Sequence, residues 1–378
     1  MAGKKRSKVQ EKKDKATNKA IDGVATMIYK SIQKNKKPDL SLPVRSLSNV
    51  KYDQKKGYFE IGNSTKVRTL TVNTVKTFAQ SLKMMALSKE LITQNDFATK
   101  RDAYYQSKNW QEAKFDEQVE SDTVMDDIEA LFASQNLTRE ELRFVPQEHG
   151  GAVAGDLIVV DQDLDTGKTI EIDCTKFGSG AYSVPSWVEH LQFKTKAKFI
   201  LAIETHGMFQ RLQSHNFWRK SKSILVSMSG VPSRACRRFI RRLSEECKIP
   251  VYAFTDCDPY GISNIYRTLK VGSGNAAHIN RFFCVPNAKF LGMTPQDIID
   301  WKLKDATHKL SDIDIKRARD ALKNDPFFQS HKPWSKALEQ MIKMGVRAEQ
   351  QALSKHGLNF VIEEYLPKKL KNTKLFLP

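Results

Sequence analysis

The sequence lacks the features that mark several protein classes. Its five cysteines are spread over 378 residues, and no two have the Cys-x-x-Cys spacing of a zinc site. We find no signal peptide, so a disulfide framework is not expected. No apolar run is long enough to span a bilayer, and no internal repeat is visible. We therefore expect an intracellular, cytoplasmic chain in a reducing compartment, with no membrane partner.

Acidic residues are in deficit. The chain has 62 Lys and Arg against 43 Asp and Glu, a formal net charge of +19. The first 15 residues are Lys-rich, but without them the net charge is still about +14, so the tail alone does not explain the excess. Such a charge favours a polyanionic partner, most commonly nucleic acid. The alternative is a soluble protein that carries basic tails.

The second half of the chain alternates between strand and helix patterns. Strands are predicted at Phe199–Ile203, Ile224–Val226, Val251–Phe254 and Phe282–Val285, and helices at 206–212, Ser233–Cys247 and Ile262–Val271. This order predicts an α/β fold with a mostly parallel sheet and helices on both faces. Beyond Thr294 the pattern is helical, with a long amphipathic helix over Pro333–His356 that ends at Gly357.

Three acids follow predicted strands of this sheet. Glu204 follows the first strand, and Asp256 and Asp258 follow the third. Residues two apart on an extended segment point the same way, and ligands collect at the carboxyl ends of parallel strands. Like charges so close repel each other, and a Mg²⁺ ion would relieve that repulsion. The alternative for Asp256-Cys-Asp-Pro is turn chemistry that closes a strand.

The first half contains a hairpin and several helices. We predict the hairpin at Leu47–Ile61, helices at Thr71–Leu91, from about Thr99 and at Asp122–Phe132, and strands within Arg143–Val160. The short break at 93–95 between two of these helices suggests helix-turn-helix geometry, and the later strands would form its wing. This pattern is frequent in DNA-binding proteins.

A further amphipathic helix is predicted near the start of the chain, over Ala16–Gln33. One face carries apolar side chains at helical spacing: Ile21, Val24, Ile28 and Ile32. This face could pack on its own domain, or it could dock on another subunit. The residues leave both options open.

Arginines gather on the helix over Ser233–Cys247. Cys236 and Phe239 belong to its apolar face, while the other side carries Arg234, Arg237, Arg238 and Arg241. The alternative is that the arginine side of this helix contacts only solvent. Because no acid is interleaved with the four arginines, we favour contact with DNA phosphates.

Two adjacent tyrosines, Tyr104 and Tyr105, follow Lys100 and Arg101. We predict that Lys100 contacts DNA. A tyrosine can be a covalent nucleophile, but its pKa near 10 requires a nearby cation or base. Arg101 precedes Tyr105 by one helical turn, close enough to help. Taken alone, the pair is better explained by one core tyrosine and one exposed tyrosine without a catalytic role.

At this point several motifs together resemble a known family. The chain is similar to the A subunits of DNA topoisomerase VI, a type IIB topoisomerase, and to the meiotic double-strand-break transesterase of eukaryotes. The resemblance runs from about Pro43 to Pro378. Its motifs are Pro43-Val-Arg-Ser-Leu-Ser-Asn-Val50, Thr99-Lys-Arg-Asp-Ala-Tyr-Tyr105, Ile203-Glu204, Thr255-Asp-Cys-Asp-Pro-Tyr-Gly261, Met344-Gly-Val-Arg-Ala-Glu-Gln-Gln-Ala-Leu-Ser-Lys-His-Gly357 and Glu364-Tyr-Leu-Pro367.

The resemblance implies a set of roles. Tyr105 would be the nucleophile, assisted by Arg101, and Glu204, Asp256 and Asp258 would bind Mg²⁺ in a Toprim domain. The chain would form a homodimer with a groove for double-stranded DNA and join a B subunit in an A2B2 heterotetramer. ATP would bind to that B subunit, in agreement with the absence of a Walker-type motif here. The family pattern changes at Thr205-His206 and in the loop 228–233.

The resemblance also sets the expected domains and reaction. We expect a tail, docking helix and strand arm over 1–70, a winged-helix (CAP-like) domain over 71–160, a connector over 161–195 and a Toprim domain with a helical elaboration over 196–378. The expected reaction is ATP-dependent relaxation and decatenation of nucleoid DNA through a double-strand break with a 5′-phosphotyrosine link. Two alternatives remain: a break-forming transesterase of meiotic type, and a non-catalytic DNA-binding protein.

Overall fold

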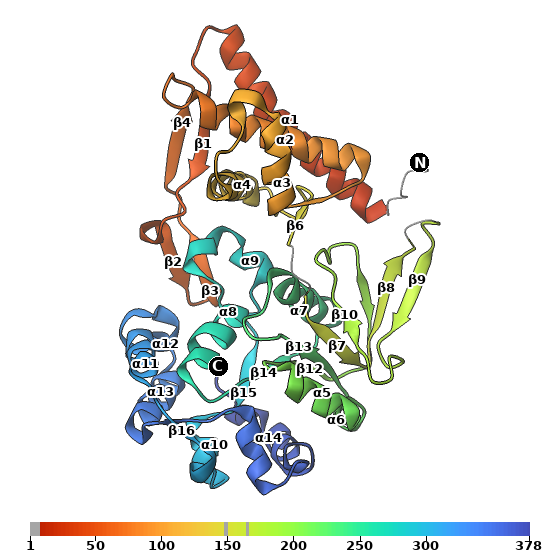
Figure 1. Ribbon diagram of the computed structural model, residues 1–378, viewed down its shortest axis with the longest axis vertical. Helices are drawn as coiled ribbons and strands as arrows, with labels where there is room; N and C mark the ends of the chain where they lie inside the picture. Colours follow the sequence, from red (N-terminus) through yellow and green to blue (C-terminus); the bar gives the residue numbers. More distant parts are fainter. Residues whose placement is uncertain (1–7, 147–149, 164–165) are drawn as a thin grey trace.

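A computed structural model describes residues 8–146, 150–163 and 166–378. Figure 1 shows the first helices gathered at one end of the molecule and a central sheet in its lower half. The sheet has six strands, which in spatial order are β10 (Tyr182–Ser183), β7 (Ala152–Gly155), β13 (Ser223–Ser227), β12 (Phe199–Ile203), β14 (Val251–Phe254) and β15 (Lys289–Gly292). Strands β13, β12, β14 and β15 run parallel to one another, while β7 and β10 are antiparallel additions.

The inner strands are apolar because helices cover both faces of the sheet. Every residue of β12 and of β13 is buried, as expected for a parallel sheet between two helical layers. Strand β13 lies on one side of β12 and β14 on the other. Right-handed crossovers therefore place α5 (His206–Ser214) and α7 (Arg234–Cys247) on opposite faces, as Figure 1 shows. The sheet reverses its winding between β12 and β14, which is where open α/β sheets place their sites.

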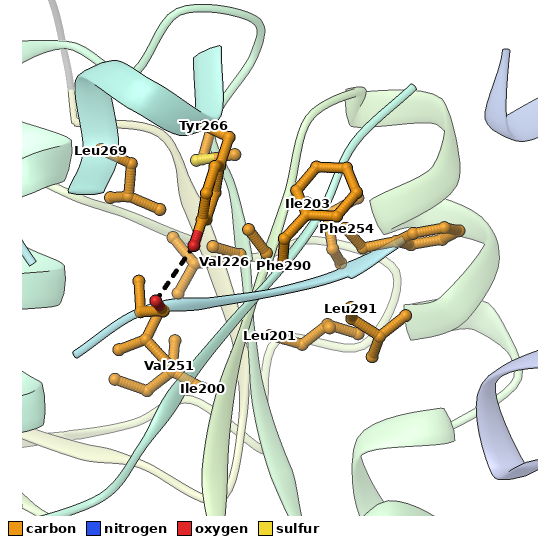
Figure 2. Packing of buried hydrophobic residues seen from close by; sticks show 14 of the residues in the cluster. Ile200, Leu201, Ile203, Val226, Val251, Phe254, Tyr266, Leu269, Phe290 and Leu291 are labelled. Atoms are coloured by element: carbon orange, nitrogen blue, oxygen red, sulfur yellow. Dashed lines mark hydrogen bonds between the residues drawn. The ribbon is translucent and has the colours of Figure 1, made fainter. Parts of the chain in front are cut away.

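The core around this sheet is continuous. Ile200 of β12 pairs with Val251 of β14, and Figure 2 draws both in one buried cluster with Leu201 of β12 and Leu291 of β15. Tyr266 is also buried there, and its hydroxyl donates a hydrogen bond of 3.1 Å to the carbonyl of Ala288. Burial of its only polar side-chain atom is thus compensated. The core fixes the strand ends that carry the acids.

The N-terminal part is mostly helical. Its helices are α1 (Lys8–Gln33), α2 (Val75–Gln94), α3 (Lys100–Gln106) and α4 (Gln118–Ala133), and its short strands are β1 (Asp39–Pro43), β2 (Val50–Asp53), β3 (Tyr58–Ile61), β4 (Thr65–Thr69), β5 (Ala98–Thr99) and β6 (Phe144–Val145). β2 and β3 form the predicted hairpin. Asn95 ends α2 in the left-handed conformation, with a φ of 53°, and Thr99 starts α3 with a capping box. These two caps produce the predicted break between the helices.

Helix α1 is longer and more firmly packed than the sequence suggests. It begins at Lys8 and not at Ala16, and Lys13 forms ion pairs with Glu141 and Glu189. Ile21 and Ile28 are buried in the cores of this part, and Val24 packs against the same cores. These three side chains therefore do not form a free docking face, because α1 uses them to pack on its own chain. Ile32 is 52% exposed.

The predicted wing is also wrong in part. Within 143–160, residues 147–149 lie outside the described residues, and β7 pairs with β13 in the central sheet. The next strand, β8 (Ile158–Gln162), lies between β9 (Thr169–Asp173) and β11 (Gln192–Lys194) in a separate antiparallel sheet. A boundary at 160 would cut this sheet. Glycine and β-branched residues indicated strands, but they carry no information about distant partners.

The C-terminal half departs from expectation in two places. Phe282–Val285 is not a strand, since 280–283 forms helix α9 (Asn280–Phe283). The predicted long helix ends at Met344 and not at His356, because α13 (Lys332–Met344) is stopped by Gly345 with a φ of 65°. The other elements of this half are α6 (Phe217–Ser221), α8 (Arg267–Lys270), α10 (Pro295–Asp300), β16 (His308–Lys309), α11 (Asp312–Asn324), α12 (Pro326–Ser330), β17 (Val346–Arg347) and α14 (Leu366–Lys371).

The cysteines and the long helices bear on the expectations about disulfides and membrane spans. All five cysteines are free thiols. Among the helices of the described ranges, none is both long and apolar enough to cross a membrane.

Candidate active site

The three predicted acids meet at the carboxyl ends of β12 and β14. Glu204 follows β12 directly, and Asp256 lies two residues beyond β14. The backbone N–H of Asp256 donates a hydrogen bond of 2.9 Å to Oε2 of Glu204. The backbone N–H of Gly261 donates one of 2.5 Å to Oδ1 of Asp258. The turn after β14 is thereby fixed so that both aspartates face the glutamate.

The space beside Gly261 shows how closely Glu204 and Asp258 approach each other. A Cβ atom at this position would lie 3.2 Å from Oε2 of Glu204 and 3.2 Å from Oδ1 of Asp258. It would also lie 2.9 Å from the carbonyl oxygen of Asp256, which is closer than real Cβ atoms come to backbone. Only glycine fits without a shift, and the acids converge on the space that its missing side chain leaves.

Burial disfavours the ionised forms of the three carboxyl groups. Burial raises the pKa of Glu204 to about 8, and the charge of Asp256 adds to this rise. Burial likewise raises the pKa of Asp256 to about 6, against a lowering hydrogen bond from Gln350. Burial also raises the pKa of Asp258. Carboxyl groups that resist ionisation together are a frequent sign of a cation-binding or catalytic site.

The donors suit a hard cation that keeps part of its water shell. Glu204 and Asp256 each accept one backbone hydrogen bond, on Oε2 and Oδ1, which leaves their other carboxylate oxygens available for a ligand. The acids do not form a closed cage, because in the described ranges no three His, Cys, Asp or Glu side chains are placed to hold one ion together. Mg²⁺ fits this arrangement, since it is commonly bound through one or two carboxylates plus water and phosphate.

The tyrosine pair lies on α3. Tyr105 is 56% exposed, whereas Tyr104 packs against the N-terminal core and donates its hydroxyl proton to the carbonyl of Asp116 over 3.0 Å. The guanidinium carbon of Arg101 lies 5.9 Å from the centre of the Tyr105 ring. One tyrosine is therefore structural, and the other is exposed, with a cation near its ring.

The tyrosine and the acids are not brought together within one chain. Figure 1 shows α3 in the upper part of the molecule and the strands that carry the acids in the lower part. A reaction that uses both Tyr105 and Glu204 thus needs a second copy of the chain or a large movement.

Known proteins match this chain along nearly its whole length. Family models match in three consecutive segments: type IIB DNA topoisomerase over 76–143, the all-beta domain of the DNA topoisomerase VI alpha subunit over 147–197, and the Toprim domain shared by topoisomerase 6 A subunits and Spo11 over 199–370. The chain is 49% identical to the A subunit of type 2 DNA topoisomerase 6 from Methanocaldococcus jannaschii, over 98% of each chain. It is 37% identical to the one from Methanosarcina barkeri, over 97% of this chain and 98% of the relative.

The chain belongs to the type IIB DNA topoisomerase family, among its A subunits.

Within this family member, the arginine face of α7 is not free. Arg234 forms ion pairs with Glu129 and Glu140, including a contact of 2.6 Å from its Nε to Oε1 of Glu140. Arg238 binds Glu189 in the same way. These acids come from other elements, 49 to 105 residues away in sequence. Helical spacing identified the face correctly, but it could not reveal the acids that pack onto it.

The remaining predicted DNA contacts of the topoisomerase chain also have protein neighbours. Arg241 donates to the carbonyl of Cys284 over 2.6 Å, and the guanidinium carbon of Arg237 lies 5.9 Å from the Phe283 ring centre. Lys100 forms ion pairs of 3.0 and 3.8 Å with Asp126 and Asp122, which tie α3 to α4. These side chains therefore have protein neighbours in the described structure, and their contact with DNA stays a prediction.

Sequence reasoning missed the segment after α13, which contacts the acids of the candidate site. Gln350 is fully buried, its backbone N–H donates 2.8 Å to Oδ1 of Asp256, and its Oε1 accepts from Thr205 over 2.9 Å. Thr205, at which the family pattern changes, also caps α5. Gly345 in the middle of the predicted helix was the available signal that the chain turns here.

Proposed function

We propose that Tyr105 of this family member is the nucleophile that cleaves DNA, and that Glu204, Asp256 and Asp258 hold Mg²⁺ near the scissile backbone, either directly or through the water that the ion keeps. The chain is the DNA-cleaving subunit of a type IIB topoisomerase. The observation that carries the residue assignment is the contrast between an exposed Tyr105 beside Arg101 and three converging, buried carboxyl groups at the switch point of the sheet.

The chemistry is a transesterification. The phenolic oxygen of Tyr105 attacks the phosphorus, a Tyr–O–P bond to the 5′ phosphate forms, and the bond to the 3′ oxygen breaks. The phenolic proton is balanced by the proton that the 3′ hydroxyl gains. Attack by that hydroxyl reverses the step, so resealing needs no other energy source. We assign to Arg101, whose guanidinium carbon lies 5.9 Å from the centre of the Tyr105 ring, the role of stabilising the negative charge of the phenolate and the phosphate.

The carboxylates supply the second part of the site. A bound Mg²⁺ would neutralise phosphate charge and orient the backbone for in-line displacement. The residues of the chain itself keep the acids in place, through the hydrogen bonds that Asp256, Gly261 and Gln350 donate.

The assembly is part of the proposal. Because α3 and the acids lie apart in one chain, we place the Tyr105 of one copy against the carboxylates of another, in a homodimer with a groove for double-stranded DNA. The A2B2 heterotetramer with an ATP-binding B subunit explains how a chain of this family is driven by ATP. Residues 75–145, with the helices α2 to α4 and the strands β5 and β6, would be the winged-helix module, and 199–370 the Toprim domain.

The test is a cleavage assay with labelled supercoiled DNA, the partner B subunit, Mg²⁺ and a non-hydrolysable ATP analogue, quenched with detergent. Wild type and Tyr104→Phe are expected to give a protein–DNA adduct on the 5′ end, and Tyr105→Phe none. An adduct that survives in Tyr105→Phe contradicts the assignment of the nucleophile. DNA binding by wild type without any adduct contradicts the proposed reaction.

A further inference from the structure

The segment after α13 adds a short antiparallel pairing to the site. The backbone N–H of Cys257 donates 2.8 Å to the carbonyl of Ala348, and the N–H of Ala348 donates 3.0 Å to the carbonyl of Cys257. Opposed residues in such a pair share a side of the ladder, and their neighbours point to the other side. Arg347 and Glu349 therefore lie on the side of Asp258 and Asp256.

The contacts of Arg347 agree with this register. Its Nη1 lies 3.7 Å from Oδ2 of Asp258, and its Nε lies 3.8 Å from Oδ2 of Asp314. Both distances are too long for a hydrogen bond. The charge of Arg347 lowers the pKa values of Asp256 and Asp258, against the larger effect of burial. The guanidinium is thus within electrostatic reach of the acids without being hydrogen-bonded to them.

The guanidinium of Arg347 has donors that no acceptor in the described part of the protein uses. Its Nε is buried and has no hydrogen-bond partner in the described part of the chain, although the side chain as a whole is 35% exposed. Asp314 is already engaged, since its Oδ2 accepts from the backbone and the hydroxyl of Ser311 in the capping box of α11. A planar group with five donors is suited to a phosphate, which it can bind through two parallel hydrogen bonds.

A second arginine lies next to it. Nη1 of Arg317, a residue of α11, lies 3.8 Å from Oδ1 of Asp314, and the guanidinium carbon of Arg317 lies 5.1 Å from the centre of the Tyr260 ring. Tyr260 is 40% exposed and belongs to the turn that carries Asp258. The edge of the carboxylate cluster is therefore positively charged on the side of α11.

The carboxyl groups of the site would repel the phosphates of a DNA backbone. Glu204, Asp256, Asp258 and Glu349 all influence one another, as the contribution of Glu349 to the raised pKa values of Glu204 and Asp256 shows. A phosphodiester that approaches four carboxyl groups is repelled unless cations stand beside them. Arg234 and Arg238 of α7 cannot do this, because they are paired with Glu129, Glu140 and Glu189.

We propose that Arg347 binds a non-bridging phosphate oxygen of the DNA backbone at the edge of the Glu204–Asp256–Asp258 cluster, with Arg317 as its neighbour. This role deepens the proposed function and rests on it. The arginine holds the backbone against the site, while the carboxylates take the cation.

The experiment compares Arg347→Ala and Arg347→Lys with Arg319→Ala, which removes an exposed arginine of helix α11. Binding of a labelled duplex to the A–B complex is measured against salt concentration, in a Tyr105→Phe background with Mg²⁺. Arg347→Ala is expected to weaken binding about 10- to 100-fold and to reduce the salt slope by about 0.9, the value for one lost phosphate contact. Arg347→Lys should keep the slope with weaker binding, and Arg319→Ala should match the parent protein.

A second readout is the adduct yield in proteins that retain Tyr105, together with the melting temperature of each variant. Loss of adduct in Arg347→Ala with an unchanged salt slope would assign Arg347 to holding Asp258 only and overturn the proposal. The same slope and adduct yield as Arg319→Ala would also overturn it. If the parent protein forms no adduct, the proposed function fails, yet the salt slope still decides whether Arg347 contacts phosphate.

Discussion

Glu204 accepts a hydrogen bond of 2.9 Å from the backbone N–H of Asp256, and this bond joins the ends of two adjacent parallel strands. The glutamate is thereby held in a buried position that opposes its charge, with a pKa raised from 4.5 to about 8. Its ionisation must be supported by something else, and a cation is the natural candidate.

The metal-free protein should therefore become more stable when this charge is removed. Between pH 4.5 and 8 the folded state keeps a proton on Glu204 that the unfolded state has lost, so stability falls as pH rises through this window. Glu204→Gln keeps a side-chain oxygen that can accept the hydrogen bond from Asp256, and it removes the carboxyl group that titrates. We expect the variant to gain about 1–3 kcal/mol over wild type at pH 8 and little at pH 4.5. Urea unfolding with a chelator at both pH values measures this, and Glu363→Gln, at an exposed position, is the control. An equal difference at both pH values would contradict the linkage.

Gly261→Ala tests the convergence of the acids. The new Cβ would press on the carbonyl of Asp256 at 2.9 Å and on two carboxylates at 3.2 Å, so we expect a loss of about 1–3 kcal/mol in stability from the forced shift. DNA cleavage should fall at least about tenfold, since misplacing groups by an ångström costs this or more. Gly207→Ala is the matched control, because nothing lies within 4 Å of its added Cβ in α5. Unchanged cleavage in folded Gly261→Ala would contradict the geometry.

Arg234→Ala distinguishes a structural arginine from a DNA contact. Its removal leaves the buried carboxylates of Glu129 and Glu140 without their cation, and breaking a buried pair from one side costs about 3–5 kcal/mol. We expect a lower free energy of unfolding by denaturant and an unchanged salt slope of DNA binding at a temperature where the variant is folded. A normal stability with a reduced slope would restore the hypothesis of a DNA-binding face on α7.

The apolar face of helix α1 contains one buried and one exposed isoleucine whose substitutions can be compared, Ile21 and Ile32. Ile21→Ala removes a buried side chain and should cost about 2–4 kcal/mol in the free energy of unfolding. Ile32→Ala changes an exposed side chain and should cost less than about 0.5 kcal/mol. If the exposed end of α1 docks on the B subunit, Ile32→Asp weakens association of the subunits without loss of stability. Association measured by sedimentation that is equal to wild type would reject that docking site.

Local signals in the sequence predicted the elements that local chemistry determines. The helix start near Thr99, the break at 93–95 and the apolar strands before Glu204 and Asp256 were all recognisable, because each depends on neighbours in the chain. The three acids could be placed together because the ends of neighbouring parallel strands must meet.

The sequence analysis did not predict contacts between elements that are separated in the chain. The partners of Arg234 and Lys100 come from other elements, and the strand partner of β7 lies about 70 residues away. Periodicity tells which residues share a face and not what covers it. Arg347 was hidden for the same reason, since a continuous helix was predicted across Gly345 and the pairing of Ala348 with Cys257 depends on the whole fold.

The ion pairs of α7 have a mechanical consequence. Arg234 and Arg238 bind Glu129 of helix α4 and the carboxylates of Glu140 and Glu189, while Lys13 of α1 reaches the same Glu189. Swinging the tyrosine-bearing helices away from the sheet would strip several buried charges of their counter-ions at once. In the proposed dimer we therefore expect each copy of the chain to move as one rigid unit when the cut duplex is drawn apart, so that the gap for the passing duplex opens between the copies and not inside one.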